Sequence, residues 1–259
     1  MTDKEKGLEN HKIAAKKLGL IKNKAFAFIK KNLGKASEYD VQKFILAEFK
    51  KEGLVTLWND RKYTLKDERN PALIIAVNEN SAIPHYSPRK NSTKIIKKNN
   101  LVLIDIWARL NEEEAYFADI SWVTYSGRTI PQKIRKTFSE VINARNFIVR
   151  FIKKSLNSKK FPKTRDVEIA TRNYFKKLNL EKYFLHRTGH SLGIHICHGK
   201  YFRFDKKSGT RIKPNIPFTV EPGLYFKNRF GIRSEINCYA TKDYKLIITT
   251  EIQNKIIKI

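Results

Sequence analysis

Two stretches of this chain place acidic residues inside runs that are otherwise apolar, and this restricts the fold more than any other feature. The stretch LVLIDIWARLNEEEAYFADISWVTYSG at 101–127 has two apolar runs around the polar residues 111–114, the pattern of a β-hairpin. Its strands are apolar on both faces, so Asp105 is expected to be buried. With a turn centred on Glu112, Asp105 lies directly across from Asp119, with Cβ atoms about 5 Å apart.

Facing carboxylates are unfavourable unless a positive group lies between them, because a buried, unpaired carboxylate is costly. A solvated hairpin face would explain one such pair, but the chain repeats the arrangement. In FTVEPGLYFKNRFGIRSEINCYA at 218–240, Glu221 and Glu235 lie seven residues before and seven after Asn228. Both pairs have the same separation, 14 residues. Two such hairpins predict four carboxylates that converge on a cation.

A dense group of histidines supports this prediction. Four of the six histidines fall within thirteen residues, HRTGHSLGIHICH at 186–198. Imidazole and carboxylate ligands together suit a borderline divalent cation such as Mn, Fe, Co or Zn. Cys197 and Cys238 lack the spacing of a structural zinc site. Four carboxylates exceed the needs of one ion, which favours two ions about 3.5 to 4 Å apart. His85, just ahead of the first hairpin, is a further candidate site residue.

Composition is useful here mainly for what it excludes. The chain has 259 residues, of which 41% are hydrophobic and 12% aromatic, so it can bury a sizeable core. No apolar run reaches the roughly 18 residues of a membrane span, and the N-terminus lacks the apolar segment of a secretory signal. Two cysteines make no disulfide framework. We therefore expect a reduced, cytoplasmic protein without membrane contact.

The formal net charge of +28 makes nucleic acid an alternative partner. The basic residues are nevertheless scattered over every region, and no zinc-finger or RNP-type motif is present. A proteome rich in Lys, Ile and Asn would give the same charge. The charge pattern thus does not favour a nucleic-acid-binding face, although it leaves this alternative open.

Helical patterns precede each hairpin. Ser37 and Asp40 form a capping box at the start of one helix, which Gly53 is expected to end. A shift of 126 residues superposes 40–54 on 166–180 with six identities in fifteen positions. Another long helix is expected over 133–156. Helices followed by strands, twice over, predict an α+β fold with both hairpins in a central antiparallel sheet.

Five motifs in this order, LIDIWA, YFADISWVTYSG, HRTGHSLG, FTVEPGLYF and GIRSEIN, resemble those of the pita-bread dinuclear metallopeptidases. This family includes methionine aminopeptidase, aminopeptidase P, prolidase and creatinase. The resemblance runs from about Lys12 onward and implies a pita-bread (creatinase/aminopeptidase-like) fold with helices packed on the sheet. It implies one domain, 1–259, with pseudo-symmetric halves at about 12–130 and 131–259 and no separate N-terminal domain.

The resemblance also implies the ligands of two divalent ions, with manganese preferred over cobalt, iron or zinc. Asp105 would bind one ion, His190 and Glu221 the other, and Asp119 and Glu235 would bridge both. The spacing between Asp105 and Asp119 exceeds that of the family, so three extra residues are expected to loop out of the turn.

Details favour the aminopeptidase P and prolidase branch. His186 four residues before His190, Arg233 two before Glu235, and His85 ahead of the first aspartate all resemble that branch. His85 is expected to act in catalysis and His186 to bind substrate. Arg233 is expected to fix a carboxylate, either the substrate's or that of Glu235.

One position departs from the family pattern. The second histidine of the family falls seven residues after the metal-binding histidine, where this chain has Cys197. His198, one position further on, is expected to take the catalytic role, with His195 as the alternative substrate-side residue.

The function implied is a metal-dependent exopeptidase that cleaves Xaa-Pro peptides by a hydroxide bridging two metal ions, with Glu221 transferring the proton. A homodimer is left open. The alternatives are a methionine-type aminopeptidase and a non-catalytic pita-bread protein that binds nucleic acid or protein. All five ligand positions are filled, which argues against the second alternative.

Overall fold

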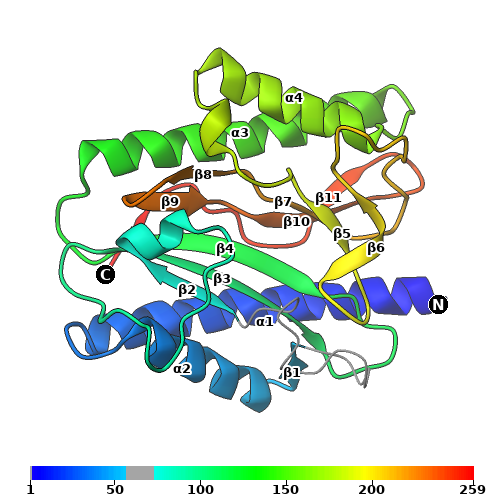
Figure 1. Cartoon of the computed structure of the whole chain (residues 1–259). Helices are drawn as coiled ribbons and strands as arrows, with labels where there is room; N and C mark the ends of the chain where they lie inside the picture. Colours follow the sequence, from blue (N-terminus) through cyan, green and yellow to red (C-terminus); the bar gives the residue numbers. More distant parts are fainter. Residues whose placement is uncertain (1, 57–72) are drawn as a thin grey trace.

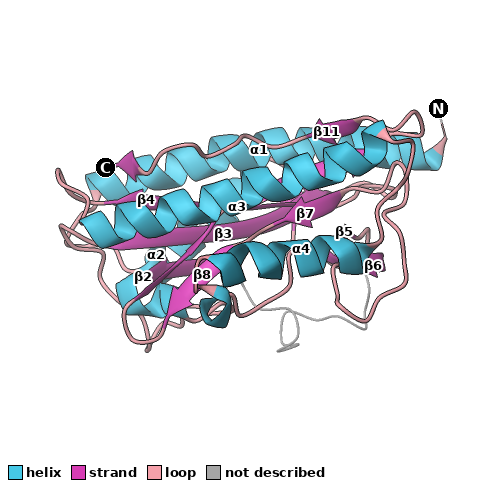
Figure 2. Cartoon of the chain, turned by 90° about the horizontal axis from the view of Figure 1, so that it is seen from above, coloured by secondary structure: helices cyan, strands magenta, loops and turns pink. Residues whose placement is uncertain are grey.

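The computed structural model describes residues 2–56 and 73–259, which form helices on both sides of a layer of strands (Figure 1). Helices α1 (Asp3–Lys31) and α2 (Glu38–Lys51) cover one face, and α3 (Gln132–Asn157) and α4 (Thr164–Lys177) cover the other. Figure 2 shows α3 running along the strands. Short 3-10 helices lie at η1 (Asn78–Ala82) and η2 (Glu181–Tyr183). The predicted α+β architecture is confirmed.

The strand layer is divided into three hydrogen-bonded sheets. One contains β1 (Leu54–Val55), β2 (Ile74–Val77), β3 (Leu101–Leu110), β4 (Ala118–Tyr125) and β12 (Ile257–Lys258). The second contains β11 (Leu246–Ile248), β10 (Ile236–Ala240), β7 (Phe218–Val220), β5 (His190–Leu192) and β6 (His198–Arg203). The third is the pair β8 (Gly223–Phe226) and β9 (Phe230–Arg233). The paired strands are antiparallel, except that β12 runs parallel to β4.

The two predicted hairpins therefore do not share one continuous ladder. They meet where β4 lies beside β10, and side chains replace part of the backbone pairing. The Asn237 amide accepts from the backbone N–H of Asp119 at 2.9 Å and donates to the Asp119 carbonyl at 2.7 Å. The backbone N–H of Glu235 donates to the Ser121 carbonyl at 3.3 Å. These bonds bring the two acid-bearing hairpins into contact.

The predicted register of the first hairpin was wrong by two residues. Asp105 lies opposite Ser121, and Asp119 lies opposite Trp107. The cause is the connection at 111–117, whose last residues are buried instead of solvated, and Phe117 donates its backbone N–H to Gly193 at 2.9 Å. Residues 111–114 form an exposed or half-buried turn, whereas 115–117 are buried. The two aspartates become diagonal neighbours on one face, with Cβ atoms about 7 to 8 Å apart, which leaves room for an ion.

The second hairpin has the predicted register. Gly223 pairs with Arg233 in β8 and β9, and Val220 pairs with Ile236 in β7 and β10. Both pairs are centred on Asn228, whose positive φ of 59° suits a tight turn. Glu221 and Glu235 therefore occupy facing positions at the gap between the two strand pairs.

The predicted repeat is seen in the helices. The bounds of α2 and α4 differ by the same shift of 126 residues at both ends. Ser37 and Asp40 form the predicted capping box, and Gly53 follows the helix with φ of 66°. The two helices pack on opposite faces of the strand layer (Figure 1).

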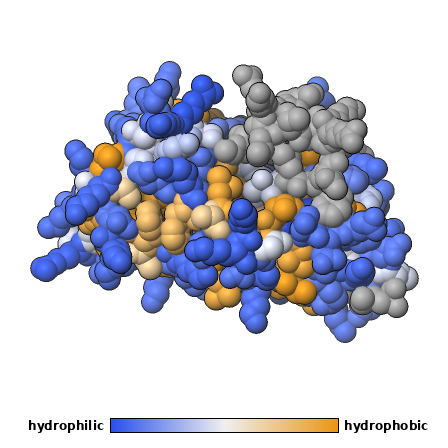
Figure 3. Space-filling view, turned by 90° about the horizontal axis from the view of Figure 1, so that it is seen from below, coloured by the Kyte–Doolittle hydropathy of each residue, from blue (hydrophilic) through white to orange (hydrophobic). Residues whose placement is uncertain are grey.

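Helix α1 contributes much of the core through its inward face. Leu18, Ile21 and Ile29 are fully buried, and the helix packs against β3 and β4. Each such side chain contributes about 1.5 to 3 kcal/mol on burial. The face that carries α1 and α2 is mostly hydrophilic, with apolar areas between (Figure 3). Among the described residues, no helix has the length and apolar character needed to cross a membrane.

Candidate metal centre and active site

The five predicted metal ligands line a single cavity of about 1250 Å³. Two aspartates come from the first hairpin, Asp105 in β3 and Asp119 in β4. His190 begins β5, while Glu221 follows β7 and Glu235 precedes β10. The site therefore lies where strands from both halves of the sequence meet.

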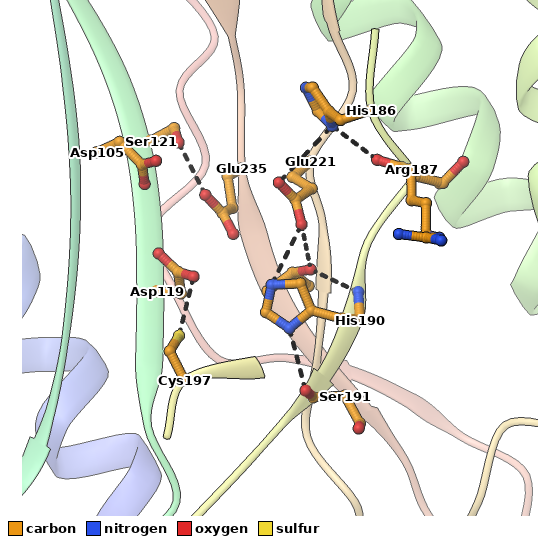
Figure 4. A network of polar contacts seen from close by, with 12 residues as sticks. Asp105, Asp119, Ser121, His186, Arg187, His190, Ser191, Cys197, Glu221 and Glu235 are labelled. Atoms are coloured by element: carbon orange, nitrogen blue, oxygen red, sulfur yellow. Dashed lines mark hydrogen bonds and ion pairs between the residues drawn. The ribbon is translucent and has the colours of Figure 1, made fainter. Parts of the chain in front are cut away.

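Three of these residues form the tightest group. One ligand atom each from Asp119, His190 and Glu235 lies within 4.8 Å of the other two. Figure 4 shows these side chains, together with that of Glu221, pointing into a shared space. Mixed oxygen and nitrogen donors at this separation suit a divalent transition-metal ion.

The strongest sign of a cation is a set of buried oxygens without partners. Oδ1 of Asp105, Oδ1 of Asp119 and Oε1 of Glu235 are buried and accept no hydrogen bond from the residues that the structure describes. A buried polar atom left unpaired costs about 1 to 3 kcal/mol, and more when it is charged. A divalent ion would satisfy all three oxygens, so the donor set fits the metal ions that the sequence predicts.

The second oxygen of each carboxylate is held by a neighbour. Asp119 Oδ2 accepts from Cys197 Sγ at 3.1 Å, and Glu235 Oε2 accepts from Ser121 Oγ at 2.8 Å (Figure 4). Asp105 Oδ2 forms an ion pair with Arg233. Such outer partners orient metal ligands, because a carboxylate fixed by one oxygen presents the other in a defined direction.

His190 is held as a neutral ligand. Its Nδ1 lies 3.0 Å from the Ser191 carbonyl, which can only accept, so Nδ1 carries the proton and Nε2 has a free lone pair. Nε2 lies 3.4 Å from Glu221 Oε1. Burial lowers the pKa of His190 to about 4. The ring therefore stays neutral at physiological pH, as metal binding requires.

The carboxylates destabilise one another without a cation. Burial, followed by the charges of Asp105 and Glu221, raises the pKa of Asp119 well above its ordinary value. Burial and then Asp119 do the same for the pKa of Glu235. Burial raises the pKa of Glu221 to about 7, against the lowering effect of Arg233. Bound cations would remove this repulsion.

Arg233 pairs with a carboxylate other than that of Glu235, one of the two partners predicted for it. It pairs with Asp105, so the prediction of Glu235 as its partner was wrong. The same guanidinium donates to Ser121 Oγ at 2.8 Å, Tyr225 Oη at 2.7 Å and the Pro84 carbonyl at 3.2 Å. Its side chain is 4% exposed, and most of its N–H groups are used inside the protein. Arg233 thus fixes the wall of the cavity around Asp105.

The predicted histidines occupy three different environments. His186 uses both ring nitrogens, Nε2 with Tyr225 Oη at 2.7 Å and Nδ1 with the Arg187 carbonyl at 2.8 Å, and burial lowers its pKa to about 3. His198 and His85 line the cavity but are exposed at its mouth. His195 is exposed and is not among the residues that line the cavity, so the structure does not bring it to the site.

The order of Cys197 and His198 follows from the loop between β5 and β6. A Cβ atom on Gly193 would lie 2.2 Å from the Ile196 carbonyl, so only glycine allows the chain to fold back this closely. The fold directs Cys197 inward to Asp119. The ring of His198 lies 4.0 Å from that of His190, centroid to centroid.

Several site residues were not anticipated from the sequence. Ser121, Thr219 and Tyr225 hold Glu235, Glu221 and His186, respectively. Their positions carried a usable signal, because Ser121 and Thr219 each lie two residues from a predicted ligand in a strand and so share its face. No local sequence pattern indicated Tyr225, because its contact with His186 depends on how β8 packs.

Fold and site together define a pita-bread protein with a candidate metal centre where strands from both halves of the sequence meet. The profile of metallopeptidase family M24 matches residues 9–242. The chain therefore belongs to metallopeptidase family M24.

Individual relatives agree with this assignment. An uncharacterized peptidase of Schizosaccharomyces pombe is 28% identical over 177 residues, which cover 68% of this chain and 37% of the relative. The Xaa-Pro dipeptidase of Pyrococcus furiosus is 28% identical over 170 residues, which cover 66% of this chain and 44% of the relative. This chain thus matches less than half the length of these relatives.

The prolidase of Thermococcus sibiricus has a similar fold. Its crystal structure matches with a TM-score of 0.79 and 24% identity, covering 98% of this chain and 61% of that one. The pita-bread fold and the likeness to the aminopeptidase P and prolidase branch are confirmed.

Proposed function

We propose that this protein is a metal-dependent exopeptidase that hydrolyses Xaa-Pro bonds, with manganese as the preferred ion ahead of cobalt, iron or zinc. The observation that carries the proposal is the set of three partnerless buried carboxylate oxygens, on Asp105, Asp119 and Glu235, in a cavity where His190 lies close to Asp119 and Glu235. Asp105, Asp119, His190, Glu221 and Glu235 would hold two ions. When bound, the ions would supply an activated water and polarise the scissile carbonyl.

Glu221 is suited to move the proton. Burial raises the pKa of the Glu221 carboxyl group to about 7 in the metal-free protein, and bound cations would lower it, so that the group is a carboxylate able to accept a proton near neutral pH. Thr219 Oγ donates to its Oε1 at 2.9 Å, and this bond fixes the direction of the carboxyl group. Glu221 would take a proton from the attacking water and pass it to the leaving nitrogen.

The histidines at the cavity mouth are suited to bind the peptide. His198 and His85 can donate from neutral rings to the developing oxyanion or to the peptide backbone. Repulsion from the ring of His190, which gains a charge only at acid pH, and then burial lower the pKa of His198 to about 4, so the ring of His198 is neutral at pH 7. His186 lies 4.0 Å from Glu221 Oε2 and would position that carboxyl group.

The proposal is tested with the purified protein, first treated with chelator and then supplied with Mn²⁺ or Co²⁺. We expect cleavage of Ala-Pro or Ala-Pro-Ala and no cleavage after chelation. For Asp119→Asn we expect a loss in kcat/KM of more than about 100-fold, because removing a ligand should cost more than the roughly 10- to 100-fold that is usual for an outer partner of a ligand. Asp243→Asn removes an exposed carboxylate remote from the cavity and should leave kcat/KM unchanged. A fully active, metal-replete Asp119→Asn variant would refute the bridging role.

The same assay separates the alternatives. Preferential cleavage of Met-Ala-Ser over Ala-Pro-Ala would indicate a methionine-type aminopeptidase. No turnover with either ion, together with tight and salt-dependent RNA binding, would indicate a non-catalytic binding protein. Both cysteines are free and buried, which supports the reduced, cytoplasmic location that we propose.

A further inference from the structure

We propose that Arg203 and Lys207, on the wall of the cavity, select Xaa-Pro peptides with an acidic side chain at the residue before the proline or at the residue after it. This inference rests on the proposed function and adds a substrate class to it. It is carried by the charge balance of the cavity and by the position of Arg203 relative to His190.

The cavity is lined by equal numbers of acidic and basic side chains, but they are not fully paired with one another. Three cations have an acidic partner in the cavity: Arg233 pairs with Asp105, Arg172 with Glu168, and Arg187 with Asp205. The acids left over are the candidate metal ligands Asp119, Glu221 and Glu235, and the cations left over are Arg203, Lys206 and Lys207. Once metal ions neutralise these acids, the positive charges on the cavity wall exceed the negative ones, because Asp205, whose carboxylate also senses the charge of Arg203, is already paired with Arg187.

Arg203 lies on the same face as a metal ligand. In the ladder between β5 and β6, Arg203 is the direct partner of His190. Residues directly opposite in an antiparallel ladder project to the same side of the sheet, so Arg203 stands beside the centre. Its side chain is exposed and forms no ion pair within 4.0 Å with any residue in the described parts of the chain.

The loop that carries Lys207 is held in a fixed position. Asp205 accepts from Arg187 Nε at 3.0 Å and from the backbone N–H of Lys207 at 3.0 Å. Through these bonds, the negative charge of Asp205 is already paired with Arg187 and with the backbone of its own loop. Lys206 lies 3.8 Å from Glu181, whereas Lys207 has no acidic partner among residues 2–56 and 73–259.

Two uncompensated cations in a concave site attract anions more strongly than the same charges on an open surface. Guanidinium and ammonium groups are the usual partners of carboxylates. The ligand that fits this arrangement is an acidic peptide, because the same cavity contains the proposed peptidase centre.

The test compares kcat/KM for Glu-Pro-Ala, Gln-Pro-Ala and Lys-Pro-Ala, and for the amidated peptides Ala-Pro-Glu, Ala-Pro-Gln and Ala-Pro-Lys. In one of the two series, we expect Glu to exceed Gln by roughly three- to tenfold and Lys to fall below Gln. The preference should shrink in about 1 M salt, where the Debye length falls to about 3 Å. It should disappear in the double variant Arg203→Gln/Lys207→Gln.

The matched control is Lys97→Gln/Lys98→Gln, which removes the same charge from exposed residues outside the cavity. It should keep the preference for Glu. Equal loss in both double variants would assign the effect to the overall charge and overturn the proposal. Cleavage of the Gln peptides without any preference for Glu would also overturn it while leaving the peptidase function intact. Failure to cleave any of these peptides and also the dipeptide Ala-Pro would refute the proposed function itself.

Discussion

At the scale of single residues, the candidate centre is built from carboxylates whose two oxygens differ in their hydrogen-bond partners. One oxygen of Asp105, Asp119 and Glu235 is bound to a protein donor, and the other is free. The donors differ in strength, from a guanidinium to a hydroxyl to a thiol. Since the thiol is the weakest donor, Asp119 is the ligand whose orientation is most easily disturbed.

Replacing Cys197 by alanine removes the donor to Asp119 Oδ2. We expect Co²⁺ affinity to fall by about 10- to 100-fold, the usual cost of losing an outer partner of a metal ligand. Cys197→Ser keeps a donor and should retain most of the affinity. Cys238→Ser changes the other buried cysteine and serves as the control. Isothermal titration with Co²⁺ measures the effect, and unchanged affinity in Cys197→Ala would show that the thiol does not orient Asp119.

Glu221 should make the metal-free protein less stable as pH rises. Its pKa is about 7 in the folded state against an ordinary value of 4.5, so the folded protein binds more protons than the unfolded chain between these values. The stability that Glu221 contributes is present below pH 4.5 and is lost as pH rises through 7. Relative to the always neutral Glu221→Gln variant, the free energy of unfolding of the wild type should fall by on the order of 3 kcal/mol.

Urea unfolding of both proteins in chelator at pH 5 and pH 8 measures this difference. The buried histidines have lowered pKa values, so their contribution to stability changes with pH in the opposite direction. Because both proteins contain these histidines, the comparison with Glu221→Gln removes that contribution. A difference that does not change with pH would contradict the raised pKa.

At the scale of elements, the two related helices begin differently. Ser37 caps α2 with its side chain, whereas the equivalent residue before α4, Lys163, makes no side-chain cap. We expect Ser37→Ala to lower the free energy of unfolding by about 1 to 2 kcal/mol. Lys163→Ala, at the matching position, should change it by less than about 0.5 kcal/mol. Equal effects in urea unfolding would show that the capping box does not stabilise α2.

The elements also show which features the sequence could predict. Helix α2 has its predicted start and end, because capping and glycine signals act within a few residues. The second hairpin has its predicted register for the same reason: its turn at 227–229 is short and polar. The first hairpin does not, because the packing of 115–117 against distant parts of the chain shifts the pairing of β3 and β4.

The site follows the same rule. Its five candidate ligands could be found from motifs, but not the partner of Arg233 or the inward direction of Cys197. Arg233 reaches Asp105 across the two halves, and Cys197 is aimed by the close fold of the loop at Gly193. Both depend on contacts between residues far apart in the sequence, which local patterns do not report.

At the scale of the whole molecule, the ligands come from both halves. Asp105 and Asp119 belong to the first, and His190, Glu221 and Glu235 to the second. Bound ions should therefore stabilise the whole fold. At a Mn²⁺ concentration of a hundred times Kd, we expect about 2.7 kcal/mol of added stability. Asp119→Asn should lose most of this gain in urea unfolding, whereas an equal gain in this variant would place the ion elsewhere.

The late position of Glu235 has a consequence for biosynthesis. A growing chain on the ribosome completes both aspartates early, but it cannot assemble the full cage of donors until the region beyond β9 has emerged. Truncated products that end before Glu235 would thus be unable to cut peptides.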